Sequence, residues 1–210
     1  MSVNLYQIHI KTVEINKVTS FLVSWLADEY GEMPFVRSNQ DSSFTFFNSE
    51  NPTMFALGQL HDGWLTVLHD SFEPLMDLTS SLSSSFQTSA IQALGQSTVD
   101  TYHLSIFNEG QLLRKIDAGE EYNGVEQSGE PFPFEKESMN EKIGSGEPSF
   151  FDYQDMQKYC LHFGIDLLKD PSEIDGAWEV IQLELEQKSP HSDSRKSILD
   201  NIFRLFRKKN

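Results

Sequence analysis

Two histidine–aspartate pairs are the first candidates for chemistry in this sequence, because such pairs can bind metals or relay protons. They are His61-Asp62 and His69-Asp70, and the two histidines are eight residues apart. An extended connection of that length separates them by roughly 26 Å, whereas the ligands of one metal ion must lie within about 2–2.5 Å of it. We therefore predict that the first pair lies in a turn and the second at a helix entry, with no metal site.

Cys160 is the candidate thiol nucleophile, and it is the only cysteine of the chain. It falls on the apolar stripe of a predicted helix over residues 152–163, together with Tyr159 and Phe163. A catalytic thiol needs a lowered pKa and a neighbouring base, but His162 would lie on another face of the helix. We predict that Cys160 is a buried small apolar residue, and a single cysteine allows no intrachain disulfide.

Motifs of common enzymes are missing from the sequence. It has no phosphate-binding glycine loop, no GxSxG elbow, no HExxH and no CxxC, and the GSGEP stretch at 144–148 has no following lysine. We therefore predict a protein that is not an enzyme and that uses no cofactor and no metal. The alternative is an enzyme whose site assembles from distant residues, for which the candidates are His69, Asp70, His103 and Arg114.

An arginine in a predicted hairpin needs an explanation. Residues 98–116 alternate between apolar and polar side chains on either side of a three-residue loop that ends in glycine. Pairing Phe107 with Gln111 places Arg114 opposite Leu104, on the apolar face of the hairpin. An unpaired charge in that position would cost several kcal/mol, so we expect Arg114 to have a partner.

The segment 129–135 (GEPFPFE) can supply that partner. It carries two carboxylates and two aromatic rings: Glu130, Glu135, Phe132 and Phe134. We predict that this segment folds over the hairpin, with its rings on the apolar face and one glutamate on the guanidinium of Arg114. Two alternatives remain: Arg114 lines a pocket for an anionic ligand, or the register slips and Arg114 is solvated.

The charge of the chain is large and uneven. The net charge is −16, composed of −20 over residues 1–190 and +4 over residues 191–210. Such a negative body repels phosphate backbones and attracts basic partners, so we predict a basic protein partner and no nucleic acid. The first residues do not resemble a signal peptide and no apolar run is long enough to span a membrane, so we predict a cytoplasmic protein.

The basic tail forms a predicted amphipathic helix over residues 195–208, joined to a single domain over residues 1–190 by a short linker. Its apolar side includes Phe203 and Phe206. The helix could dock on the acidic body, lie on an anionic membrane surface, or bind the groove of a partner. We therefore count both phenylalanines among the candidate binding residues.

The hydrophobic periods predict an α+β fold, in which a mainly antiparallel sheet is covered by helices. One helix spans residues 17–30, between a cap at Asn16 and a stop at Gly31. A second spans residues 71–82, begins at Ser71 and ends early, and the third begins at Asp152 and stops at Gly164. The expected strands and loops are a strand within 2–12, a meander over 43–69 with a turn at Asp62-Gly63, the hairpin at 98–116, a long loop at 117–150, and a strand or helix at 177–186.

The order of short motifs over roughly residues 60–168 resembles a loose group of uncharacterised bacterial cytoplasmic domains, some of which look like immunity proteins or other accessory proteins of toxin systems. These motifs are Gly63-Trp64 with Val67, Gly110-x-Leu112-x-Arg114, the GEPxPxE segment 129–135, and Phe163-Gly164-Ile165. The resemblance implies a non-enzymatic protein and transfers no catalytic residue. Together with the charge, it predicts a binding protein that acts stoichiometrically on another protein, with a membrane-surface adaptor as a further alternative.

Overall fold

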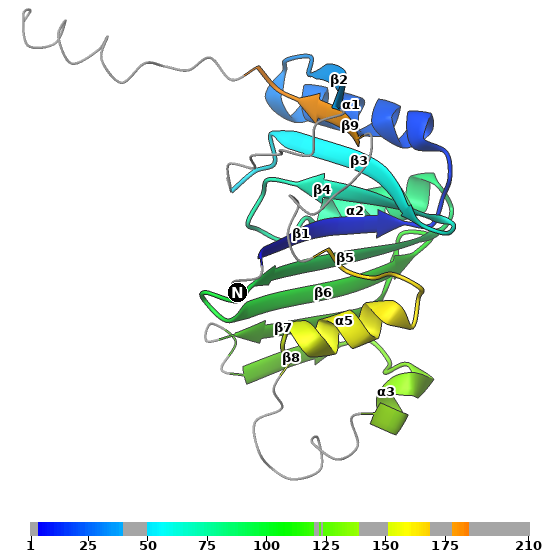
Figure 1. The fold of residues 1–210 in the computed structure, drawn as a ribbon, viewed down its shortest axis with the longest axis vertical. Coiled ribbons are helices and arrows are strands. Elements are labelled where there is room, and N and C mark those ends of the chain that lie inside the picture. Colours follow the sequence, from blue (N-terminus) through cyan, green and yellow to red (C-terminus); the bar gives the residue numbers. More distant parts are fainter. Residues whose placement is uncertain are drawn as a thin grey trace, which may run out of the picture.

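The strands pair into one antiparallel sheet in the computed structural model (Figure 1), which describes residues 4–39, 50–119, 122, 124–138, 151–168 and 178–184. Within these residues, nine strands lie in the order β2-β9-β3-β4-β1-β5-β6-β7-β8. The strands are β1 (Asn4–Ile10), β2 (Phe35–Asn39), β3 (Met54–His61), β4 (Trp64–His69), β5 (Ser89–Gln96), β6 (Thr101–Asn108), β7 (Gln111–Gly119), β8 (Gly124–Ser128) and β9 (Trp178–Gln182). The described helices are α1 (Ile15–Tyr30), α2 (Met76–Ser85), α3 (Pro133–Ser138) and α5 (Tyr153–Leu161). The predicted, mainly antiparallel sheet is confirmed.

The central strands bury side chains on both faces of the sheet. Ile8 of β1 belongs to a buried cluster with Leu22 of α1 and Leu78 of α2. Leu5 of the same strand belongs to a second cluster with Met156 of α5. Because successive residues of a strand point to opposite faces, β1 separates two cores. Figure 1 shows α5 in front of β6 and β7, and α2 behind the sheet.

The helix ends agree with the sequence only in part. Gly31 ends α1 with a φ of 71°, as predicted, but Asn16 is not its cap, because the helix already begins after Glu14 without a side-chain cap. Ser71 does not cap α2, which begins after Leu75 and continues to Ser85 rather than ending early. The Ser71 hydroxyl instead accepts a hydrogen bond from the Glu73 N–H in the preceding turn. Asp152 caps α5 as predicted.

The turn between β6 and β7 differs from the predicted one. Asn108, not Phe107, pairs with Gln111, so the loop has two residues rather than three. These are Glu109 and Gly110, with φ values of 50° and 84°. A two-residue hairpin loop of this kind requires positive φ at both positions, which explains the glycine.

A bulge then changes the register along the same hairpin. Phe107 pairs with Leu112, but Arg114 pairs with Ile106 rather than with the predicted Leu104. The predicted register was therefore wrong by two residues at Arg114. Because side chains alternate with a period of two, that shift leaves Arg114 on the predicted apolar face.

Several elements differ from the expected loops or lie outside the described residues. The predicted loop at 117–150 is wrong in its first part, which contains the end of β7, the edge strand β8 and α3. The undecided segment at 177–186 contains strand β9. Residues 43–49, the first part of the meander predicted over 43–69, lie outside the described residues, as does the helix predicted at 195–208 with Phe203 and Phe206. No described helix is long and apolar enough to cross a membrane.

Candidate functional site

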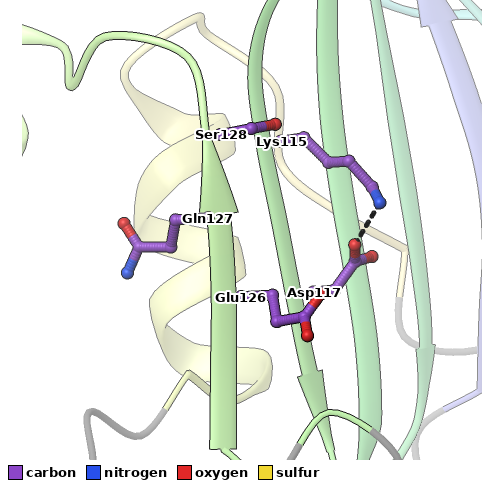
Figure 2. A pocket seen from close by; sticks show the side chains of 5 residues that line it. All are labelled: Lys115, Asp117, Glu126, Gln127 and Ser128. Carbon is purple, nitrogen blue, oxygen red and sulfur yellow. Dashed lines mark ion pairs between the residues drawn. The ribbon is translucent and has the colours of Figure 1, made fainter.

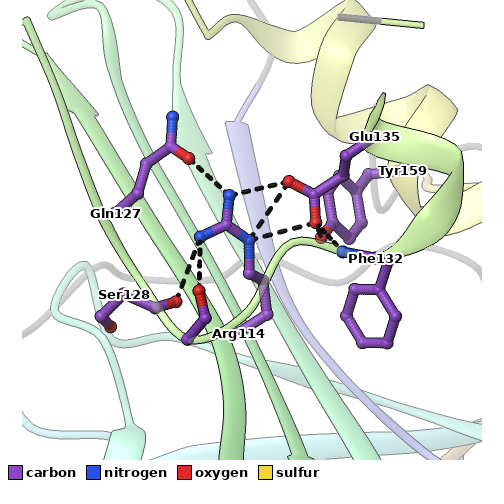
Figure 3. Close-up of polar contacts among 7 residues, drawn as sticks. Arg114, Gln127, Ser128, Phe132, Glu135 and Tyr159 are labelled. Carbon is purple, nitrogen blue, oxygen red and sulfur yellow. Dashed lines mark hydrogen bonds and ion pairs between the residues drawn. The ribbon is translucent and has the colours of Figure 1, made fainter. Parts of the chain in front are cut away.

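Arg114 is fixed by the most extensive side-chain hydrogen-bond network of the described chain (Figure 3). Its side chain is only 2% exposed. Its Nε donates to both carboxylate oxygens of Glu135, at 3.1 and 3.2 Å, and Nη2 donates to the same group at 2.7 Å. The predicted ion pair between Arg114 and a glutamate of segment 129–135 is therefore confirmed.

The remaining donors of Arg114 bind the neighbouring edge strand and its end. Nη1 donates to the backbone carbonyls of Ser128 and Gly129, at 3.2 and 3.3 Å. Nη2 also donates to the side-chain oxygen of Gln127. All five N–H groups of the guanidinium are thus in use. In this arrangement Arg114 has no donor left for an anionic ligand, so the predicted alternative of an anion pocket does not fit.

The carboxylate of Glu135 binds more than the arginine. It accepts a hydrogen bond from the backbone N–H of Phe132 at 2.7 Å and another from the Tyr159 hydroxyl. Burial and then the adjacent Glu135 raise the pKa of Tyr159 far above its ordinary value, so the hydroxyl stays a donor. Burial alone would lower the pKa of Arg114, but Glu135 and Tyr159 raise it. The pair is therefore charged, buried and fully hydrogen-bonded.

Aromatic rings enclose this network on the side of α5. Phe132 and Phe134 stack with their ring centres 5.6 Å apart, and the Phe134 ring meets Tyr159 edge-on at 4.9 Å. Phe163 packs edge-on against Phe132 at 5.7 Å. These contacts confirm that segment 129–135 folds over the hairpin with its rings inward, whereas Glu130 is exposed. A binding role for these residues stays a prediction.

A second polar group occupies the opposite face of β6 and β7. His103 Nδ1 lies 2.5 Å from Asp117 Oδ1, and His103 Nε2 lies 3.2 Å from the Ser105 hydroxyl. Lys115 forms an ion pair with the other oxygen of Asp117. Burial alone would raise the pKa of Asp117, but the hydrogen bonds from His103 and Lys115 hold it below its ordinary value.

A shallow pocket of about 90 Å³ adjoins this group at the β7–β8 edge (Figure 2). It is lined by Lys115, Asp117, Glu126, Gln127 and Ser128. Figure 2 shows the side chain of Lys115 directed at Asp117, while the side chain of Gln127 points away from them. The pocket has room for a few water molecules but not for a substrate of ordinary size.

The Ser105, His103 and Asp117 side chains have the connectivity of a hydrolase triad but not its accessibility. Ser105 is fully buried, and His103 and Asp117 are each 2% exposed. The surrounding strand amides are engaged in the sheet ladder, so no pair of free N–H groups faces the serine to stabilise an oxyanion. Asp117 also forms an ion pair with Lys115. We conclude that the group orders the sheet rather than performing acyl transfer.

The residues proposed for a scattered catalytic site are not brought together. Arg114 and His103 lie on opposite faces of the sheet. Arg114 pairs with Ile106, which is three residues from His103 along β6, and side chains an odd number of residues apart on a strand point to opposite faces. Asp70 accepts hydrogen bonds from the backbone of residues 53 and 54 at 2.8 and 3.1 Å and so closes the start of β3. His69 is 1% exposed, and neither ring nitrogen makes a hydrogen bond of normal geometry.

The two histidine–aspartate pairs follow the prediction only in part. His61-Asp62 lies at the β3–β4 turn as predicted, but His69-Asp70 lies at the end of β4 and is not at a helix entry, because α2 begins only after Leu75. His61 and His69 lie at opposite ends of the β3–β4 hairpin, and Gly63 forms its turn with a φ of 73°. Cys160 is fully buried on α5, and burial raises the pKa of its thiol, the reverse of what a nucleophile needs. Within the residues that the structure describes, no three metal-ligating side chains converge.

Sequence reasoning missed four members of the two networks. Ser105 and Asp117 face the same way as His103, and the alternation of polar residues with Leu104 along β6 was the available signal. Gln127 was missed because β8 was taken for part of a loop. Tyr159 was placed on the apolar stripe of its helix, but its hydroxyl bond to Glu135 has no signal in the sequence.

The largest exposed apolar group in one stretch of the described chain lies at the opposite edge of the sheet. Met33 is 74% exposed, and Phe35 and Val36 of the edge strand β2 are 40% and 46% exposed. Three exposed acidic residues precede them at the end of α1 and in the following turn: Asp28, Glu29 and Glu32. We call these six residues the β2 edge surface.

Comparison with known proteins gives no match. No family model, no curated protein and no solved structure matches the chain. The resemblance in motif order to bacterial immunity proteins therefore stays a prediction, and function must be inferred from the geometry of the chain itself.

Proposed function

We propose that this protein is a non-enzymatic binding protein that captures a basic protein stoichiometrically, as an immunity-like neutraliser or accessory protein does. The β2 edge surface is its proposed contact, and a basic, extended segment of the partner is the proposed occupant. The exposure of Phe35 and Val36 on an edge strand is the observation that carries the proposal.

An edge strand offers backbone N–H and C=O groups to any extended chain that approaches it. Natural edges are usually protected by charge, and β8 at the other end of the sheet fits that rule, with the exposed Glu126 at its centre. In β2, Phe35 and Val36 point to opposite faces, so an added strand would meet apolar surface on both sides. The contrast between the two edges supports a partner at β2.

Charge favours a basic occupant over a second copy of the chain. The three acidic residues of the β2 edge surface outnumber the single basic residue of β2, Arg37, which already contacts Gln182 and the Phe35 ring. A second copy would carry another net charge of −16 and would be repelled. The same charge would speed the encounter with a basic protein.

The finer features of the prediction belong to this proposal. We propose that helices cover both faces of the sheet in a single domain over residues 1–190, and that residues 195–208 add a basic helix. We also propose that the protein acts in the cytoplasm. The saturated donors of Arg114 and the full burial of Ser105 support a binding protein over the enzyme alternative.

The test is quantitative affinity capture from the native cell with wild-type protein and two charge-matched variants. Val36→Glu alters the β2 edge surface, and Val99→Glu adds the same charge at a position that is 56% exposed in the β5–β6 turn. We expect one basic protein at about 50 mM salt, its recovery falling several-fold at about 300 mM salt. Val36→Glu should reduce recovery about tenfold, and Val99→Glu should not.

Three results would contradict the proposal or one of its parts. Capture of no stoichiometric partner at low salt would contradict a binding function. A partner retained equally by both variants would show that the β2 edge surface is not the contact, and recovery independent of salt would refute its electrostatic part.

A further inference from the structure

A pair of histidines on the α5 side of the sheet is used by none of the functions considered above. His9 of β1 pairs with Thr66 of β4, and His61 of β3 pairs with Trp64 of the same strand. Residues 64 and 66 point to the same face, so the two histidines also share a face. Their ring centres are 6.0 Å apart, at an interplanar angle of 52°.

Both rings carry a buried nitrogen with no partner. His9 is fully buried, and its Nδ1 lies 3.1 Å from the Thr66 hydroxyl, while its Nε2 has no hydrogen bond. The Nε2 of His61 is also buried without a partner. Buried polar atoms are nearly always satisfied, so two unpartnered nitrogens on neighbouring rings require an explanation.

The Thr66 hydroxyl can orient the His9 ring for a metal. It lies 3.1 Å from Nδ1, while Nε2 has no partner. If Nδ1 donates to the Thr66 hydroxyl, Nε2 keeps a free lone pair. Histidine ligands of metals characteristically donate their other ring N–H to a nearby oxygen in this way.

A carboxylate stands near the pair. Asp166 is a neighbour of His61, because the His61 ring hydrogen-bonds to the Asp166 backbone. Asp166 is exposed, and its side chain accepts a hydrogen bond from Gln157. The three groups do not converge in the described arrangement, so Asp166 would have to turn from Gln157 to complete a site.

We propose that His9 and His61 bind one divalent transition-metal ion, such as Zn²⁺, through their Nε2 atoms, with Asp166 as a third ligand and water completing the shell. Zinc held at about 2.0–2.1 Å by two imidazoles places the ring centres about 5–6 Å apart, which the observed separation allows. Imidazole nitrogen suits Zn²⁺, Cu²⁺ and Ni²⁺ rather than Mg²⁺ or Ca²⁺. The acidic chain would also favour the approach of a cation. This site is independent of the β2 edge surface.

The experiment is a calorimetric titration of tag-free protein with Zn²⁺, together with thermal unfolding in the presence of Zn²⁺ and of a chelator. We expect one equivalent to bind and to raise the unfolding temperature, because a ligand of the folded state stabilises it. The chelator should reverse the rise. His61→Gln should weaken binding at least about tenfold, since loss of even an outer partner of a ligand costs about 10–100-fold.

His162→Gln is the matched control, because His162 is exposed on a different part of the α5 side and stacks on the Phe134 ring. It should leave Zn²⁺ affinity unchanged. Circular dichroism of His61→Gln establishes that the variant is folded. The proposal is overturned if wild-type protein shows no saturable binding and no rise in unfolding temperature, or if His61→Gln binds as tightly as the control.

Discussion

His69 should make the folded protein sensitive to mild acid. It is 1% exposed at the end of β4, and its ring meets Tyr6 edge-on at 6.1 Å. Burial lowers its pKa from 6.5 to about 3, and the nearby backbone of Ser71 opposes this shift only in part. The folded state therefore holds His69 neutral where the unfolded state would protonate it.

The direction of the pH effect follows from the lowered pKa. The unfolded state binds more protons than the folded state between about pH 3 and 6.5, so stability is lost as the pH falls through this range. It is fully present above pH 6.5. From these two pKa values, the loss attributable to His69 is about 2 kcal/mol at pH 5.

Substitution with leucine isolates this contribution. His69→Leu removes the titrating group and keeps an apolar side chain of similar size, so its stability near pH 7.5 should stay within about 1.5 kcal/mol of wild type. Between pH 7.5 and pH 5 the variant should lose about 2 kcal/mol less than wild type does. Asp70, whose pKa is raised mainly by burial, is present in both proteins, so its titration largely cancels in the difference.

The measurement is urea unfolding of both proteins at pH 7.5, 6 and 5, followed by tryptophan fluorescence. The exposed His162→Gln variant is the control and should have the wild-type pH dependence. An equal loss of stability in wild type and His69→Leu between pH 7.5 and 5 would refute the reasoning, because it would mean that His69 titrates alike in both states.

Three further substitutions or treatments test the packing on the α5 side of the sheet. Glu135→Gln should cost about 3 kcal/mol in urea unfolding, because it leaves a buried guanidinium without its counter-charge, while the exposed Glu130→Gln should change stability by less than about 0.5 kcal/mol. A loss below about 1 kcal/mol for Glu135→Gln would contradict the buried pair. Cys160 should not react with a thiol reagent in the native state and should react fully in denaturant, since it is fully buried; rapid native labelling would show that α5 opens readily. Gly129→Ala should destabilise more than Gly124→Ala, because a Cβ at 129 would lie 2.0 Å from a backbone oxygen whereas one at 124 meets no atom within 4 Å; equal losses would contradict this contact.

The Arg114–Glu135 pair shows what the sequence could predict. An arginine on an apolar face must be neutralised, and the nearby GEPFPFE segment offered both carboxylates and rings. That argument survived an error in the hairpin turn, because the shorter turn and the bulge each shifted the register by one residue, and the two shifts together kept Arg114 on its predicted face. It could not choose between Glu130 and Glu135, a choice that depends on the short helix α3.

The missed strands have physical causes. All but the end residues of β5 are buried, so both faces are packed and its sequence, SAIQALGQ, shows no clean alternation. The edge strands β2 and β8 have five residues each, too few to show a clear alternation of apolar and polar residues. The long-range pairing that orders these strands depends on contacts between distant segments, which local periodicity does not record.

The polar group around His103 could not be predicted from the sequence either. His103 and Asp117 meet because they lie directly opposite each other on β6 and β7, in the register that the shorter turn and the bulge set. Before that register is known, acidic residues are too frequent in this chain to single out Asp117.

Amide hydrogen exchange of the protein alone and in complex with the captured basic partner tests the central claim most directly. The account predicts that exchange slows in Phe35–Asn39 on binding, because a strand added to β2 engages its outward backbone groups. Exchange should be unchanged in Gly124–Ser128 at the other edge. Protection confined to β8, or none in β2, would contradict the proposed contact.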